Sequence, residues 1–176
     1  MKWRHHLCLA VGLAVLTHLA VLWVLPRAIM GRLIRTVQPD ATVPHAVVLP
    51  PLADHHARRV VMPSPDLLYA LCPFDLRGRP VRIQADPRTP HYWSIALYGS
   101  NSDNFFVLND RQAAGAPVDL LLVDAQADAV PTPVGARRVV SPSSQGLLLM
   151  RVLAGDYASQ KMVVEAARRS LRCTPA

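Results

Sequence analysis

The alternation of apolar and polar residues divides the chain into three parts. The first, residues 1–35, contains a run from Leu7 to Leu25 that is 19 residues long and carries no formal charge. Thr17 and His18 are its only clearly polar members. At a rise of about 1.5 Å per residue, such a helix nearly matches a hydrocarbon core about 30 Å thick. The pattern predicts a transmembrane anchor that crosses the lipid bilayer through residues 7–25.

A cleaved signal peptide is the competing interpretation of this run. Its apolar region would be roughly 7 to 15 residues long and would end at a small-x-small cleavage site. Here the run is longer and leads into Leu25-Pro26-Arg27, which is no such site. An uncleaved anchor is therefore favoured. Apolar residues then recur at helical spacing among arginines, so the helix is expected to continue along the interface or stand out of it; they are Ile29, Met30, Leu33 and Ile34.

The second part, residues 36–65, contains six prolines. Proline fixes φ and removes a hydrogen-bond donor, so this tether should run extended over a surface. Two short β-type pieces within it, residues 46–49 and 59–62, can dock as edge strands.

The third part, residues 66–176, consists of short apolar runs separated by turn signals. In the stretch 92–98, Trp93, Ile95 and Leu97 alternate with the residues between them, which indicates a strand. Seven such strands, at residues 67–76, 81–85, 92–98, 104–108, 118–123, 137–140 and 146–153, predict a mainly β domain, a β-sandwich or partly closed barrel. The first of them is apolar throughout its middle and is expected to lie at the centre of a sheet.

One helix is expected to close the domain. Asp156, after Gly155, is a plausible N-cap residue. An apolar stripe with 3–4 spacing follows, and basic residues lie near the C-terminal end, where the helix dipole favours them. The stripe comprises Val163, Val164, Ala167 and Leu171, and the basic residues are Arg168, Arg169 and Arg172.

Between two of the predicted strands lies a short polar patch, "GSNSD", at residues 99–103. Five residues of this composition typically join two strands as a β-hairpin. The turn chemistry favours a plain turn, whereas a binding loop is the alternative, because loops at sandwich ends carry polar groups outward.

The net charge of +7 would suit nucleic acid, but the positions of the charges remove that signal. From Thr36 onward there are 14 Lys and Arg against 12 Asp and Glu. The other basic residues flank the apolar run, where they suit lipid headgroups, and no basic stripe is interleaved with stacking aromatics. Nucleic-acid binding is therefore not expected. The flanking charges are too balanced to fix the orientation of the anchor.

Cys72 and Cys173 are the only cysteines outside the membrane run. Two distant thiols behind a single anchor suggest one disulfide, which would tie the helix end to a core strand and place the domain outside the cytoplasm. Two buried free thiols remain the alternative. There is no C-x-x-C, which disfavours redox catalysis and a zinc knuckle.

Candidate chemistry is sparse. His91 is the only histidine of the strand region, and Glu165 is the only glutamate of the chain. The tether histidines His45, His55 and His56 are best interpreted as solvated linker residues rather than a metal site. No phosphate-binding, dinucleotide-binding, hydrolase or metalloprotease motif occurs. We therefore predict no catalytic residue, cofactor or metal, and an enzyme is not favoured.

The segment "PSPDLLYALCPFD", residues 63–75, and its surroundings resemble a bacterial family, the domain of unknown function 1254. The matching positions are Pro65, Asp66, Tyr69, Asp75 and Pro80, with Ser64 in place of the usual asparagine. The aromatic start at residues 91–93, the Asn104-Phe105 pair, and the closing strand and helix within residues 141–171 extend the resemblance.

The resemblance implies a β-sandwich-type domain that is often paired in bacteria with the related domain of unknown function 1214. A separate membrane-anchored protein carrying that second domain is therefore the expected partner. The family brings no settled activity.

Two functions remain open. The leading hypothesis is a single-pass protein of the bacterial inner membrane with a periplasmic β domain that binds a partner or acts as a scaffold in the cell envelope. The alternative is an envelope enzyme or small-ligand binder that uses polar groups at one end of the sandwich. Its candidate binding residues are Asp66, Tyr69, Tyr92, Asp103 and Asn104.

Overall fold

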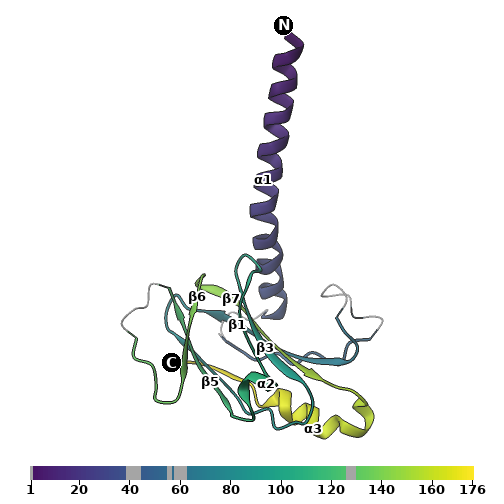
Figure 1. Cartoon of the computed structure of the whole chain (residues 1–176), viewed down its shortest axis with the longest axis vertical. Helices are drawn as coiled ribbons and strands as arrows, with labels where there is room; N and C mark the ends of the chain where they lie inside the picture. Colours follow the sequence, from purple (N-terminus) through teal and green to yellow (C-terminus); the bar gives the residue numbers. More distant parts are fainter. Residues whose placement is uncertain (1, 39–44, 55–56, 58–62, 126–129) are drawn as a thin grey trace.

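The computed structural model describes the chain except residues 1, 39–44, 55–56, 58–62 and 126–129. A single long helix, α1 (Lys2–Val37), rises from a β domain (Figure 1). The side chains of its apolar run are exposed in the isolated chain, and the helix is long and apolar enough to cross a membrane. Helix α1 continues well beyond Pro26, as the spacing of its apolar residues predicts.

Two four-stranded sheets form the domain, which confirms the expected sandwich. Sheet A has the strand order β1-β7-β3-β4, and sheet B the order β6-β5-β2-β8. All neighbouring strands are antiparallel except β5 and β6, which are parallel. The strands are β1 (Leu67–Asp75), β2 (Val81–Ala85), β3 (Trp93–Gly99), β4 (Asn104–Asn109), β5 (Val118–Asp124), β6 (Arg137–Ser141), β7 (Gln145–Leu153) and β8 (Arg172–Pro175).

The core lies between the sheets and follows from the period-2 pattern of each strand. Leu68, Ile95 and Met150 of sheet A and Ile83 and Leu120 of sheet B are almost completely buried in it. Helix α3 (Tyr157–Arg169) connects β7 to β8 and contributes Val164 and Ala167 to the same core. A further short helix, α2 (Asp110–Ala113), follows β4.

Three details of the closing segment differ from the sequence prediction. Helix α3 ends at Arg169, so Arg172 lies in strand β8 instead of the last helical turn. Residues 172–175 are recruited as a strand because β2 offers them a free edge to pair with. Asp156 is the N-cap residue of α3, but its side chain makes no capping hydrogen bond.

Strand β1 is at an edge of sheet A, not at its centre as its apolar sequence suggested. It is nevertheless well covered. The tether residue Val48 pairs with Leu71 through two backbone hydrogen bonds of 2.8 and 2.9 Å. The tether piece at residues 46–49 thus docks as a single bridge, and Pro73, two residues beyond Leu71, has no N–H to continue it. The second piece, residues 59–62, lies outside the described residues.

Candidate functional site at the anchor-side end

Helix α1 is packed directly onto the domain. Met30 is only 5% exposed and contacts Leu71 of β1 and Leu147 of β7 on the outer face of sheet A. This junction cluster is completed by partly buried apolar side chains, Leu33, Ile34, Val37, Tyr98 and Leu149. One stripe of α1 faces the sheet, because its apolar residues recur at helical spacing, at Met30, Leu33, Ile34 and Val37. The junction fixes the direction in which α1 leaves the sandwich.

The polar loop between β3 and β4 lies against the same helix. The hairpin itself is as predicted, with β3 and β4 antiparallel. Within the loop, Ser102 has a left-handed backbone with φ of 70°, and its hydroxyl donates a hydrogen bond of 3.0 Å to the carbonyl of Pro26. Pro26 lies within helix α1, and its carbonyl oxygen can accept this bond because a carbonyl oxygen has two lone pairs. The loop is therefore more than a plain turn, since it is a second contact between domain and helix.

Strand register gathers three connections at this end of the sandwich. Gly99 pairs with Gly146 and Asp75 with Gln145, so the β3–β4 loop lies beside the connections that follow β1 and precede β7. We call the end formed by residues 76–80, 100–103 and 142–144 the anchor-side end. In Figure 1 the loop between β3 and β4 and the β6–β7 turn lie on the side from which α1 rises, whereas α3 lies on the opposite side.

A shallow hollow of about 670 Å³ opens at the anchor-side end, between the two sheets. Its lining includes the turn 77–80, Asp124 at the end of β5 and the serines 143 and 144. Asp75 stands beside it and accepts hydrogen bonds from Arg77 and Gln145. The hydrogen bond from Arg77 is the main reason why the pKa of Asp75 falls to about 2. The charged groups at this hollow are thus the Asp75–Arg77 ion pair, Asp124 and the exposed Arg79.

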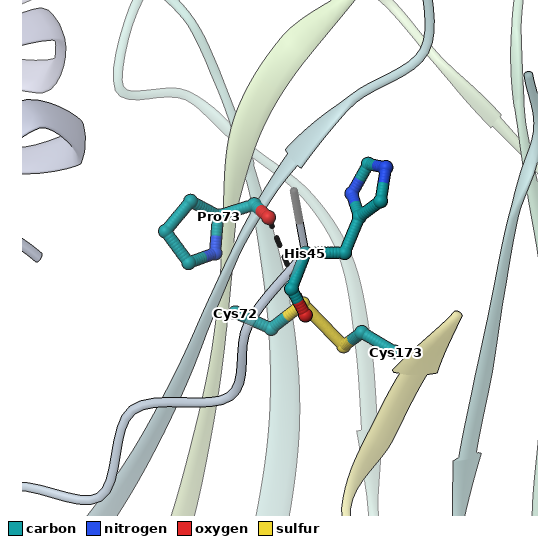
Figure 2. Close-up of a disulfide and its surroundings, with 4 residues drawn as sticks. All are labelled: His45, Cys72, Pro73 and Cys173. Atoms are coloured by element: carbon teal, nitrogen blue, oxygen red, sulfur yellow. Dashed lines mark hydrogen bonds between the residues drawn. A yellow bond between two sulfur atoms is a disulfide. The ribbon is translucent and has the colours of Figure 1, made fainter. Parts of the chain in front are cut away.

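At one lateral edge of the sandwich, Cys72 of β1 and Cys173 of β8 form a disulfide that joins sheet A to sheet B (Figure 2). Their Cα atoms are 6.7 Å apart, within the range of about 7 Å that a bridge allows. The bridge therefore ends on a strand, where the sequence had suggested the end of a helix. The backbone of His45 lies beside the two sulfur atoms in Figure 2.

His45 corrects one expectation. Its side chain is buried, with Nδ1 lacking a partner, so it is not a solvated linker residue. Burial is the main cause that lowers its pKa below the usual range. The tether is held here because Val48, just downstream, pairs with β1. His55 and His56 lie outside the described residues, and within the described part of the chain no group of three or more His, Cys, Asp or Glu could hold a metal ion.

Arg168 of α3 makes further contacts at the same edge of the sandwich. It is 4% exposed and donates to both carboxylate oxygens of Glu165, at 2.8 and 2.7 Å. Its remaining nitrogen donates to the carbonyls of Pro50 and Tyr69, at 2.6 and 3.2 Å. One guanidinium thus ties α3 to the tether and to β1.

Glu165 balances this buried charge. Burial is the largest single influence and raises its pKa, but hydrogen bonds from Arg168 and Tyr157 and the nearby arginine charges outweigh it. The pKa of Glu165 therefore lies below its usual range, and the carboxylate stays ionised at neutral pH. In turn, the hydrogen bond to Glu165 raises the pKa of Tyr157.

The five binding candidates from the sequence do not meet in one place. The carbonyls of Asp66 and Tyr92 accept hydrogen bonds from Ala154 and Leu153 at the end opposite the anchor, and Tyr69 lies near them on β1. Asp103 and Asn104 lie at the anchor-side end, beyond the seven residues of β3. Seven extended residues span about 20 Å. A single pocket built from all five is therefore not formed, and none of them lines the hollow at the anchor-side end.

Most of the five make local structural contacts. The amide of Asn104 donates to the carbonyls of Leu97 and Phe106, where the pairing of β3 and β4 shifts register. The hydroxyl of Tyr69 accepts from the backbone N–H of Ser64. Asp103 contacts Asn101 within the loop. The alternative function, a polar pocket at one end of the sandwich, therefore has no geometric support from these residues.

The comparisons with known proteins agree with this fold. The family model described as "Protein of unknown function (DUF1254)" matches residues 44–175. The chain belongs to this family. A domain of the DUF1254 family thus starts within the tether and ends in β8, so the match includes both cysteines of the disulfide.

One solved structure shows the same fold within a larger protein. The VPA0106 protein from Vibrio parahaemolyticus aligns with a TM-score of 0.56 at 16% identity, over 64% of this chain and 28% of its own. An uncharacterized protein from Burkholderia cenocepacia aligns with a TM-score of 0.46 at 16% identity, over 72% of this chain and 34% of its own. This chain therefore spans about a third or less of those chains. No curated protein matches it.

Proposed function

We propose that this protein is a single-pass protein of the bacterial inner membrane whose sandwich lies in the periplasm and serves as a binding module or scaffold for another envelope protein. The packed junction between α1 and sheet A carries the proposal. Met30 and its neighbours hold the sandwich in one orientation on its anchor, which suits a module that presents a fixed surface. A freely swinging domain would need no such contact.

The disulfide supports the periplasmic side. Cys72 and Cys173 are paired within the core of the domain, and such bonds persist in oxidising compartments and are rare in the cytosol. A C-terminal reporter fusion that is active only on one side of the membrane tests this orientation. Activity on the cytoplasmic side would contradict both the location and the bond.

Strand β4 is the surface that best suits a protein partner. It ends sheet A, pairs with β3 alone among the strands that the structure describes, and reads "NFFVLN", without a charge or a proline. Val107 on it is 46% exposed. Edge strands of soluble proteins usually carry charges, prolines or a cover, because a bare edge pairs with other chains. An extended segment of a partner could therefore add to sheet A at β4.

The expected partner is a membrane-anchored protein that carries the related domain of unknown function 1214. The family resemblance suggests this pairing, and the size of the solved relatives is in keeping with it, since most of each of those chains has no counterpart in these residues. The activity of any complex is not specified by this sandwich.

Co-purification in mild detergent at native expression tests the partner. We expect one specific companion with the unmodified chain and its loss with Val107→Lys, which places a charge on the edge strand. Val134→Lys is the matched control, since Val134 is fully exposed and lies outside the strands. Recovery of a lone monomer would contradict the proposal, and a companion that is a second copy of the chain would replace the expected partner.

A further inference from the structure

We propose that the anchor-side end of the sandwich docks on the phosphate headgroups of anionic lipids in the bilayer that holds α1, with Arg79 and Arg77 as the contacting residues. The inference rests on the membrane anchor of the proposed function, but not on its partner. It assigns a ligand chemistry to an end of the domain that would otherwise be only a set of loops.

Two tryptophans of α1 indicate where the helix crosses the membrane surfaces. Trp3 and Trp23 stand near the two ends of the apolar run and are both exposed. Twenty residues of helix separate them, about 30 Å, and tryptophan gathers at the two interfaces of a membrane. The guanidinium of Arg27 lies 4.2 Å from the ring centre of Trp23, so the first charged residue after the apolar run lies beside this tryptophan. The membrane surface therefore crosses α1 close to Pro26.

The domain reaches this level through the β3–β4 loop. Ser102 donates its hydrogen bond to Pro26 itself, so the tip of that loop is at the membrane surface. The register of β1 and β7 places the turn 76–80 and residues 142–144 at the same end. Strands β2 and β5 begin and end there too, because Val81 pairs with Leu122. The hollow at this end consequently opens toward the headgroup layer.

The charges of this end suit phosphate. Arg79 is exposed at the rim of the hollow and makes no hydrogen bond or ion pair with the described residues. Arg77 is exposed as well but is paired with Asp75, so Arg79 is the more available of the two. A guanidinium can bind a phosphate with two parallel hydrogen bonds, and Ser143 and Ser144 line the same hollow.

The balance of charge points the same way. Arginines outnumber aspartates by five to three among the residues of α1 beyond Trp23 and those at or beside the anchor-side end. The arginines are Arg27, Arg32, Arg35, Arg77 and Arg79, and the aspartates are Asp75, Asp103 and Asp124. Asp75 is paired with Arg77, and Asp103 contacts Asn101 within the loop. A basic residue near an anionic membrane surface improves association about fivefold.

The test uses the full chain in lipid nanodiscs and measures hydrogen exchange of the backbone amides at residues 77–79 and 143–144. Phosphatidylcholine nanodiscs are compared with nanodiscs that also contain phosphatidylglycerol. We expect exchange at these amides to slow about fivefold with phosphatidylglycerol, and the slowing to fade at high salt, because it is electrostatic. Inorganic phosphate added to phosphatidylcholine nanodiscs should not reproduce it.

Variants assign the effect to residues. Arg79→Gln should remove most of the slowing while leaving the Asp75–Arg77 pair intact, and Arg77→Gln with Arg79→Gln should remove it. Arg111→Gln is the matched control, because Arg111 is exposed on α2 at the opposite end. An unchanged melting temperature verifies that each variant is folded.

Three results would overturn the proposal: equal exchange in both kinds of nanodisc, the same slowing with free phosphate, or an equal loss in Arg111→Gln. A chain that does not enter nanodiscs would contradict the anchor itself and this proposal with it. Loss of the companion protein in Val107→Lys would leave the lipid result unchanged, so the failures of the two proposals can be told apart.

Discussion

The two lateral edges of the sandwich are closed by different means. On the β1–β8 side, a disulfide joins the sheets, Val48 pairs with the edge of β1, and Arg168 ties α3 to both. On the β4–β6 side, the guanidinium of Arg137 lies 5.1 Å from the ring centre of Phe106, and Phe105, Phe106 and Leu108 pack against the core. The first edge is cross-linked and partly covered by the tether, whereas β4 has no such cover among the described residues.

The difference shows how a small sandwich can be both stable and open. More of the stabilising free energy should come from the β1–β8 edge, which also contacts the anchor helix. Leu71 of β1 pairs with Val48 and belongs to the junction cluster. The bare edge lies across the sheet from it. Changes on the first side should therefore cost much more stability than changes on the second.

The disulfide should contribute most. Cys72→Ser with Cys173→Ser removes a bridge between residues 101 apart, for which the chain-entropy model gives on the order of 4 to 5 kcal/mol as an upper figure. We expect a large fall in the denaturant midpoint, or a chain that does not fold. Non-reducing mass spectrometry of the unmodified protein checks the bond directly, and two free thiols at these positions would contradict it.

Loss of Arg168 should come next. Arg168→Ala leaves the partly buried carboxylate of Glu165 without its main partner and two backbone carbonyls without this donor. Removing one partner of a buried pair costs about 3 to 5 kcal/mol. Chemical unfolding measures the effect, and Arg169→Ala is its control, because that side chain is mostly exposed. Equal losses in the two variants would contradict the role given to Arg168.

Acid should weaken the same side. The folded-state pKa values of Glu165 and Asp75 are below their ordinary values, and that of Asp75 is about 2. Their contributions are therefore complete above the unfolded pKa values near 4 and are lost as the pH falls through the folded ones. Stability should drop between about pH 4 and pH 2. In Glu165→Gln the drop should be shallower, which thermal unfolding across this range would reveal.

The β4–β6 side should respond least. Arg137→Ala removes an exposed cation–π contact, for which about 0.5 to 1 kcal/mol is typical. The expected change in the unfolding midpoint is small, but exchange of the β4 amides should become faster. A fall in the unfolding midpoint as large as that of the disulfide variant would mean that the two edges contribute equally to stability.

How much of this the sequence revealed depends on the kind of signal. Seven strands were predictable because alternating residues such as Trp93, Ile95 and Leu97 must face the core. Strand β8 was not, since "RCTP" shows no alternation and pairs only with β2. The four residues of α2 are too few for a periodic pattern.

The site was less predictable, because its contacts join distant segments. Arg168 seemed a surface residue that complements the helix dipole, yet the tether passes over it and buries it. The i,i+3 spacing to the only glutamate was the available clue. Ser102 could be assigned to a turn but not to Pro26, 76 residues away. Asp66, Tyr69 and Asn104 were chosen for polarity, and polarity near strand ends serves turns and register as well as ligands.

The disulfide between Cys72 and Cys173 also has a consequence for the order in which the domain folds after synthesis. Cys173 belongs to β8, the last strand of the sandwich in chain order, whereas Cys72 belongs to the first. If the domain crosses the membrane behind its anchor, Cys72 emerges early and waits as a thiol while about a hundred residues are exported. It pairs with its proper partner only after β8 arrives. Cys8, in the apolar run, is no competitor within the bilayer. In the proposed orientation, export would deliver the two sulfurs one after the other, with one way to join them outside the bilayer.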